Sequence, residues 1–209
     1  MCSNVNSTDV FCKAAVSKVH EQALPLLRER LDEYGYMHSC NTAETAEYLA
    51  GLYQVDSGEA FIAGLLHDWD RGHARDQLIA RARDIGFDIT PEVVAAPQIL
   101  HAHTGAADVR KIFPHLPDSV ITAIRHHTVG SRDMSDLDKV VYIADMIEPS
   151  RSSEAVTMLR DVVGVVDLDT LFLQAYQATV MHLVKNRKVM HFDTTRVWNA
   201  LIMKEMDEQ

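Results

Sequence analysis

Two adjacent residues that can bind metal, His67 and Asp68, close the apolar segment formed by residues 60–66. Ionisable side chains are costly to bury unless they are paired or bound to a metal ion. Four further residues of the same chemistry are spread along the chain, and these are His38, His101, His127 and Asp145. The six side chains offer four imidazoles and two carboxylates, which is enough to hold a pair of metal ions.

Imidazole and carboxylate ligands suit iron, manganese or zinc, and a ligand set without cysteine argues against a purely structural zinc site. Two such ions about 3.5–4 Å apart can lower the pKa of a water molecule and clamp a phosphoryl group during in-line displacement. His67 and Asp68 point about 100° apart if both are helical, but at a helix end both can reach into one cleft. The set therefore predicts a metallo-phosphohydrolase whose ligands lie on or near helix ends.

The elements that must position these residues are predicted to be helices, because helical periodicity dominates and no run of alternating residues indicates a strand. Residues 9–34 form a helical lead-in that Pro25 ends or kinks. Asn41 is expected to cap a helix that runs to Tyr53, with Glu44 completing a capping box, so that His38 precedes this helix. The apolar helix that starts at Asp56 or Ser57 belongs in the middle of a bundle.

The remaining predicted helices follow from caps and prolines. Thr90 and Pro91 start a helix that Pro97 interrupts before His101. The others are residues 74–85, 106–113, 118–127, 136–147 (capped by Ser135 and terminated by Pro149), 169–185 and 194–205. His101 and His127 are expected to end their segments, and Asp145 to lie in the last turn of its helix. We predict an all-α chain with an N-terminal helical extension, residues 1–33, and one compact domain, residues 34–209, that includes additional C-terminal helices.

Composition limits the classes of function. The 209 residues are 47% hydrophobic and 24% charged, with a formal net charge of −10. This acidity argues against nucleic-acid binding, which depends on basic side chains, but allows a small polyphosphate because bound metal ions can dominate the local field. No signal peptide or membrane span is visible, and Cys2, Cys12 and Cys40 lack the spacing of a disulfide framework. We therefore expect a cytoplasmic protein with reduced thiols and no membrane or nucleic-acid partner.

Four stretches carry a family resemblance. They are MHSCNTAETAEYLA at residues 37–50, GLLHDWDRG at 64–72, ILHAHTGA at 99–106, and HHTVGSRDMSDLDKVVYIADMIEPSR at 126–151. In this order they resemble the HD-domain superfamily of metal-dependent phosphohydrolases, whose pattern is H…HD…D, and more narrowly the YqeK-type HD hydrolases. The match covers about residues 34–165. One departure is Gly35, where the family usually has arginine three positions before its first histidine.

The resemblance implies an HD-domain helical bundle with a dinuclear metal centre, in which iron is expected first and manganese or another divalent transition metal is also possible. It implies hydrolysis of a symmetrical nucleotide polyphosphate, diadenosine tetraphosphate, to two ADP by a metal-activated water. His67 and Asp68 would be catalytic. The implied metal ligands are His38, His67, Asp68, His101, His127 and Asp145.

Five residues within the matching motifs are candidates for substrate binding. Arg71, Lys139 and Arg151 could hold phosphate oxygens, since arginine offers a bidentate fork. Thr128 and Gly130 could form a turn whose backbone N–H groups approach a phosphate. Each of the three basic residues is equally compatible with a solvated charge or an ion-pair partner.

Several roles are not fixed by the sequence pattern. His103 or His126 could replace its neighbour as a ligand, and Glu148 could either support the centre or be a surface charge at a helix end. No residue stands out as the general acid. The enzyme could act on a nucleoside monophosphate or cyclic nucleotide instead, or the chain could be a nucleotide-sensing module without activity. A homodimer is compatible with the sequence.

Overall fold

The structure, a computed structural model, describes the backbone of residues 7–207 and the side chains of residues 15–207. Within that range the chain forms eleven α-helices, one short 3₁₀ helix and no strand, which confirms the predicted all-α class. In chain order these are α1 Ser7–Arg30, α2 Glu33–Tyr53, α3 Ser57–Leu66, α4 Arg75–Asp84, α5 Pro91–Ala95, η1 Pro97–Ile99, α6 Leu100–Ile112, α7 Asp118–His126, α8 Asp136–Ile147, α9 Glu154–Val162, α10 Leu168–Lys185 and α11 Phe192–Asp207.

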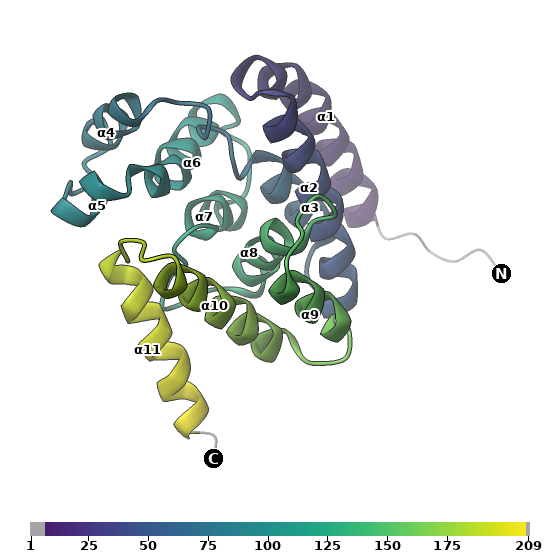
Figure 1. The fold of residues 1–209 in the computed structure, drawn as a ribbon. Helices are drawn as coiled ribbons and strands as arrows, with labels where there is room; N and C mark the ends of the chain where they lie inside the picture. Colours follow the sequence, from purple (N-terminus) through teal and green to yellow (C-terminus); the bar gives the residue numbers. More distant parts are fainter. Residues whose placement is uncertain (1–6, 208–209) are drawn as a thin grey trace.

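Helices α7 and α8 lie near the middle of the molecule, with α4–α6 on one side and α10 and α11 on another (Figure 1). Helix α3 packs against α1, α2, α7 and α8. All of its residues from Ala60 to Leu66 except Phe61 are buried, because the segment is apolar on nearly every side. The predicted central position of this helix is therefore confirmed.

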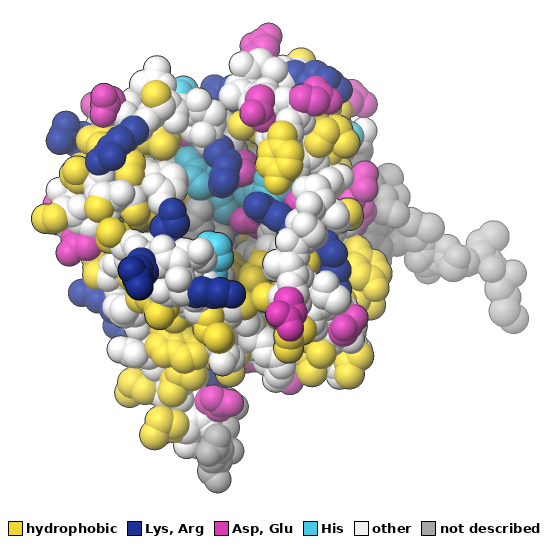
Figure 2. Space-filling view, viewed as in Figure 1, with side chains coloured by type: hydrophobic (Ala, Val, Ile, Leu, Met, Phe, Trp, Pro, Cys, Tyr) yellow, Lys and Arg dark blue, Asp and Glu magenta, His cyan; other side chains and the backbone are white. Residues whose placement is uncertain are grey.

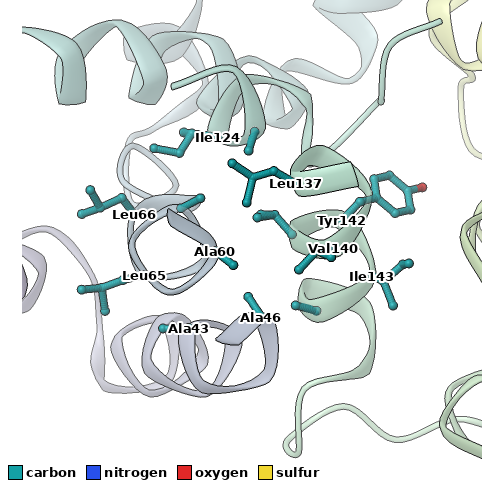
Figure 3. Packing of buried hydrophobic residues seen from close by; sticks show 14 of the residues in the cluster. Ala43, Ala46, Ala60, Leu65, Leu66, Ile124, Leu137, Val140, Tyr142 and Ile143 are labelled. Carbon is teal, nitrogen blue, oxygen red and sulfur yellow. The ribbon is translucent and has the colours of Figure 1, made fainter. Parts of the chain in front are cut away.

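Small and branched side chains fill the space between the central helices. Ala46 of α2, Ala60 of α3, Ile124 of α7 and Val140 of α8 point toward one another in this core (Figure 3), and all four are fully buried. Burying one such aliphatic side chain of valine or isoleucine size stabilises a fold by about 1.5–3 kcal/mol relative to leaving it in water. This core holds the ends of the ligand-bearing helices in fixed positions.

The backbones of α2 and α3 touch at Gly64. A Cβ atom placed there would lie 2.9 Å from the carbonyl oxygen of Thr42 and 3.0 Å from the Cα of Ala43. Contacts that short do not occur between well-packed atoms, so only glycine allows the two helices to come this close. The approach brings His38 on α2 beside His67 at the end of α3.

Three predicted caps are confirmed because each depends only on local hydrogen bonds. The side chains of Asp56, Thr90 and Ser135 accept hydrogen bonds from backbone N–H groups three residues later, at the starts of α3, α5 and α8. The acid at Asp138 completes a capping box with Ser135.

The predicted start of α2 at Asn41 is wrong. Asp32 caps this helix instead, accepting from the N–H of Gly35 at 2.8 Å, so the helix begins eight residues earlier and contains His38 in its second turn. The side chain of Asn41 donates to Glu148 at 3.1 Å rather than capping a helix. Asn41 resembles a helix cap in the sequence, but its amide donates a hydrogen bond to Glu148, which lies far along the chain.

Other helix bounds differ from those predicted. Pro25 lies inside α1 and does not end it. After α5, Pro97 opens η1, which leads directly into α6, so His101 lies in the first turn of α6 and does not end a segment. Helix α9 was not among the predicted helices, although its buried residues Val156 and Leu159 lie three positions apart on one face.

The first helix joins the main core, since Ala23 and Leu27 of α1 are fully buried in it. The division into an extension of residues 1–33 and a domain of residues 34–209 stays a prediction. Cys40 is a free thiol, whereas the side chains of Cys2 and Cys12 lie outside the described residues. None of the described helices is both long and apolar enough to cross a membrane.

Candidate metal centre

Five helices bring the six predicted ligands together. His38 extends from the second turn of α2, His67 is the C-cap of α3 with Asp68 directly after it, and the others come from the ends of three further helices. His101 lies in the first turn of α6, His127 is the C-cap of α7, and Asp145 lies in the last turn of α8. All are buried except Asp145, whose side chain is 22% exposed.

The cluster divides into two groups that share Asp68. In the first, which we call the His38 group, the Nε2 atoms of His38 and His67 lie 3.2 Å apart, and Asp145 Oδ1 lies 3.0 Å and 3.8 Å from them. In the second, the His101 group, the Nε2 atoms of His101 and His127 lie 3.0 Å apart.

Asp68 directs one carboxylate oxygen toward each group. Its Oδ2 lies 3.4 Å from His67 Nε2 and 3.6 Å from His38 Nε2. Its Oδ1 lies 2.9 Å from His101 Nε2 and 3.6 Å from His127 Nε2. This is the position that a carboxylate needs in order to bridge two cations.

The four imidazoles are oriented by hydrogen bonds at their other nitrogen, Nδ1. For the three at helix ends the acceptor is the backbone carbonyl three residues earlier, and the pairs are His67 with Gly64 at 2.7 Å, His127 with Ile124 at 2.7 Å, and His101 with Gln98. His38 Nδ1 lies 3.0 Å from Glu148 Oε1. An Nδ1 that donates a proton leaves Nε2 with a lone pair, so four acceptor nitrogens face the centre of the cluster.

Acceptors that face one another at about 3 Å repel unless a cation lies between them. Both oxygens of Asp68 are buried without a hydrogen-bond partner among the described residues. Burial by itself raises the pKa of Asp68, but a positive charge on His67, and then hydrogen bonds from His101 and His127, outweigh it and hold the pKa well below its usual value. Where the imidazoles present lone pairs instead, metal ions would supply the positive charge in place of those protons. An ionised, unsatisfied carboxylate among imidazole lone pairs fits two divalent metal ions.

Glu148 supports the His38 group from behind. Its carboxylate is fully buried and accepts from the amide of Asn41 and from the N–H of Ser150 at 2.7 Å, besides facing His38. Burial raises the pKa of Glu148, but the hydrogen bonds from Ser150 and then those from His38 and Asn41 outweigh it, so the pKa is lowered. The interpretation of Glu148 as a surface charge is therefore wrong.

The two neighbouring histidines lie elsewhere. The ring of His103 packs on Phe87 with centroids 4.5 Å apart, and His126 Nδ1 lies 3.1 Å from Asp138 Oδ2. The histidines that face the cluster are therefore His101 and His127 rather than these two.

Two of the basic candidates lie at the cluster. Arg71 Nη1 is 3.5 Å from Asp68 Oδ1, and its side chain is 52% exposed. Arg151 Nη2 is 2.8 Å from Asp145 Oδ1 and 3.3 Å from His38 Nε2. Figure 2 shows histidine side chains at the floor of a hollow with Lys and Arg side chains around its edge. One arginine thus lies beside each part of the cluster.

The other three candidates make different contacts. Lys139 forms ion pairs with Asp136 at 2.8 Å and Asp169 at 2.5 Å. Gly130 adopts a φ of 80° in the turn after α7, and a Cβ there would meet Tyr176 at 3.2 Å. The hydroxyl of Thr128 is buried and has no hydrogen-bond partner among the described residues. These contacts give no support to a phosphate site at Lys139 or Gly130.

A second set of polar residues, which sequence reasoning missed, holds the loop that carries Asp68. Asp70 is fully buried and accepts from Arg81 at 2.9 Å and 3.2 Å and from Arg30 at 3.4 Å. Arg30 also donates to Asp108 at 2.9 Å, and Trp69 donates to the same carboxylate at 2.9 Å. We call these five residues the Asp70 clamp. The only sign of this cluster in the sequence was a second acid, Asp70, two positions after Asp68. The arginines that pair with it lie far away along the chain, so the sequence did not reveal the pairing.

Comparison with known proteins identifies the family of this chain. The family model for the HD domain matches residues 35–150. A Bacillus subtilis protein named "Bis(5'-nucleosyl)-tetraphosphatase, symmetrical" is 31% identical over 185 residues, which cover 87% of this chain and 97% of that protein. A Staphylococcus aureus protein of the same name is 32% identical, and the match covers 79% of this chain and 85% of that protein.

A solved structure shares the fold. It is a Clostridium acetobutylicum protein named as a "predicted HD superfamily hydrolase involved in NAD metabolism", with a TM-score of 0.83 and 31% identity. The match covers 88% of this chain and 97% of that one.

Proposed function

The chain belongs to the HD domain family of hydrolases, and we propose that it converts symmetrical dinucleoside tetraphosphates such as diadenosine tetraphosphate, together with water, to two nucleoside diphosphates. The observation that carries this proposal is the position of Asp68, with one oxygen toward each group of histidines. The Bacillus and Staphylococcus relatives whose names state this activity align with most of the chain.

The six residues of the cluster would hold two divalent metal ions, and we propose iron in the native enzyme. Four nitrogen ligands and two carboxylates without sulfur suit iron or manganese. When bound, such a pair supplies Lewis acidity and activates water for in-line attack on phosphorus. The chain itself orients the ligands, through the carbonyls behind His67, His101 and His127 and through Glu148 behind His38.

Arg71 and Arg151 favour a substrate that is charged on both sides of the bond to be broken. One lies against Asp68 and the other against Asp145, so a guanidinium is available beside each part of the cluster. Guanidinium groups hold phosphate oxygens in bidentate pairs. In symmetrical cleavage the water oxygen bonds to one inner phosphorus, the central P–O–P bond breaks, and the bridging oxygen leaves with the other half. Each half departs as ADP.

The experiment that tests this proposal is a product analysis. Protein purified without oxygen is assayed for metal content and incubated with diadenosine tetraphosphate, mononucleotides and cyclic nucleotides. We expect ADP as the single product of the first substrate. We expect Asp68→Asn to lose activity at least 100-fold while Glu154→Gln, an exposed acid on α9, keeps it.

Two outcomes would reject the proposal. Turnover of mononucleotides or cyclic nucleotides without diadenosine tetraphosphate would indicate another hydrolase of the same family. Tight nucleotide binding without turnover by metal-loaded protein would indicate a sensing module.

We also propose that the enzyme acts in the cytoplasm, where a free thiol such as Cys40 stays reduced. A homodimer stays a prediction.

A further inference from the structure

An arginine of α9 that the proposed reaction does not use holds the turn after α8. Residues 148–151 form this turn, which is closed by a hydrogen bond of 3.0 Å from the N–H of Arg151 to the carbonyl of Glu148. Arg160 donates to three backbone carbonyls here, from Nε to Ile147 at 2.9 Å, and from Nη2 to Glu148 at 2.6 Å and to Arg151 at 3.0 Å. One guanidinium therefore connects the last residue of α8 with both ends of the turn.

Two of these acceptors lie at the C-terminal end of α8, which ends at Ile147 with Glu148 as its C-cap. The last carbonyls of a helix have no partner within it and carry partial negative charge, so a cation is favourable there. Arginine suits this position because its N–H groups point in fixed directions from one plane. A lysine would offer a single nitrogen in place of the two that Arg160 uses.

Helix α9 is a firm base for this arginine. Val156 and Leu159 are buried in the main core, and the Ser153 side chain caps the helix by accepting from the N–H of Val156 at 3.2 Å. The helix packs against α8 and α10. Arg160 thus extends to the turn from a helix whose own position is fixed by the core.

Two side chains of the same turn face the metal cluster. Glu148 Oε1 lies 3.0 Å from His38 Nδ1, and Arg151 Nη2 lies 2.8 Å from Asp145 Oδ1. Ser150, also in the turn, donates its N–H to the Glu148 carboxylate at 2.7 Å. A shift of this backbone would therefore move the group behind His38 and the group beside Asp145 together.

The turn supports only one of the two groups of the cluster. The carbonyls that orient His101 and His127 come from η1 and α7 instead, at Gln98 and Ile124. A loosened turn should therefore disturb the His38 group and leave the His101 group in place.

We propose that Arg160 is a positioning residue for the His38 group. It fixes the turn that places Glu148 behind His38 and Arg151 beside Asp145, and it thereby raises the affinity of this group for its metal ion. The inference rests on the proposed function, from which it takes metal binding at the cluster. It adds a residue beyond the matched family pattern, since the HD domain model ends at residue 150.

The test is a double-mutant cycle on metal affinity, because such a cycle separates a shared effect from two independent ones. Chelator-treated full-length protein is titrated with Mn²⁺, and bound ions are counted by electron paramagnetic resonance and calorimetry. The proteins compared are the parent, Arg160→Gln, His38→Ala and the variant with both changes. Arg110→Gln is the matched control, since Arg110 likewise donates to a backbone carbonyl, that of Leu116 at 2.6 Å, but at the opposite end of α6 from His101.

We expect Arg160→Gln to weaken the binding of one ion about five- to tenfold and to leave the other within about twofold, a smaller effect than the loss of a group that contacts a ligand directly. In the His38→Ala background the same change should alter the affinity for the remaining ion by less than about twofold, because the group on which Arg160 acts is already disabled. Arg160→Lys, measured in parallel in case the glutamine variant does not fold, keeps the charge and should have a smaller effect on the same ion. Arg110→Gln should leave both affinities unchanged even if it lowers Tm as much as Arg160→Gln.

The inference is overturned if Arg160→Gln weakens both ions equally, which would indicate a general loss of stability, or if it leaves both affinities unchanged. An undiminished effect in the His38→Ala background, or a parent protein that binds no metal, would also overturn it. Metal binding requires no turnover. A parent protein that binds two ions but leaves diadenosine tetraphosphate intact would therefore refute the proposed function, while the role of Arg160 would stand.

Discussion

Replacing Asp70 with asparagine removes the charge at the centre of the Asp70 clamp while keeping the size of the side chain. The carboxylate is fully buried and accepts two hydrogen bonds from Arg81 and one from Arg30. Breaking a fully buried ion pair costs about 3–5 kcal/mol, whereas an exposed one is worth about 1 kcal/mol or less. The side chains of Arg30 and Arg81 are 27% and 34% exposed, so water can solvate them in part after the change.

We therefore expect Asp70→Asn to lower the free energy of unfolding by about 2 kcal/mol, between the two limits. For a chain of this size, that corresponds to a decrease in Tm of about 4–8 °C. Chemical denaturation and calorimetry of chelator-treated protein measure the stability without contribution from metal. A metal-competition titration then tests whether the loop that carries Asp68 has loosened, in which case metal affinity should also fall.

The control is Asp161→Asn, since Asp161 is an exposed acid on α9. Such surface changes alter stability by about 0.5 kcal/mol or less. If Asp70→Asn also stays within about 0.5 kcal/mol of the parent protein, the two arginines do not depend on this carboxylate and the clamp has no structural role.

Three further outcomes can be measured. Glu148→Gln should weaken metal binding about 10–100-fold in a chelator competition, because the charge that orients His38 is lost, and unchanged affinity would contradict this role. Burial raises the pKa of Asp108, but the hydrogen bond from Trp69 and the charges of the clamp arginines outweigh it and lower the pKa, so this carboxylate stabilises the fold above its unfolded pKa of about 3.9. The stability difference between the parent and Asp108→Asn should therefore shrink as the pH falls below about 4 in denaturation of chelator-treated protein, and a constant difference would contradict the assignment. Gly130→Ala should cost about 1–3 kcal/mol of unfolding free energy, because φ is 80° and the new methyl would crowd Tyr176, whereas an unchanged Tm would show that the turn adapts.

Features that depend on neighbouring residues were predictable from the sequence. The caps at Asp56, Thr90 and Ser135 each use a hydrogen bond to an N–H three residues away, so their signal is contained in a short stretch. The apolar run before His67 likewise predicted a buried helix with ligands at its end.

Features that depend on distant residues were not predictable in this way. Asn41 resembles a cap, but it hydrogen-bonds to Glu148, 107 positions later. The clamp joins Arg30 to Asp108 across 78 positions. Chemical type alone cannot reveal which of the many acids and arginines will meet after folding.

The same distinction applies to the candidate site. The six predicted ligands converge in the fold, and all of them, together with Glu148, lie within the four stretches that carry the family resemblance. Lys139 lay in a motif as well, yet it pairs with Asp136 and Asp169 instead of facing the cluster. Membership of a motif therefore does not say which side of a helix a residue occupies.

The contact at Gly64 has a consequence for how substitutions can alter the metal selectivity of a site built in this way. The distance between His38 and His67 is set by how closely two backbones approach, and no ligand takes part in that contact. A single methyl group at residue 64 would press α3 away from α2 by a few tenths of an ångström. The distance between the Nε2 atoms of His38 and His67 would then increase. Selectivity among ions of different radius can therefore be retuned by a residue that never touches one, without altering any of the donor atoms.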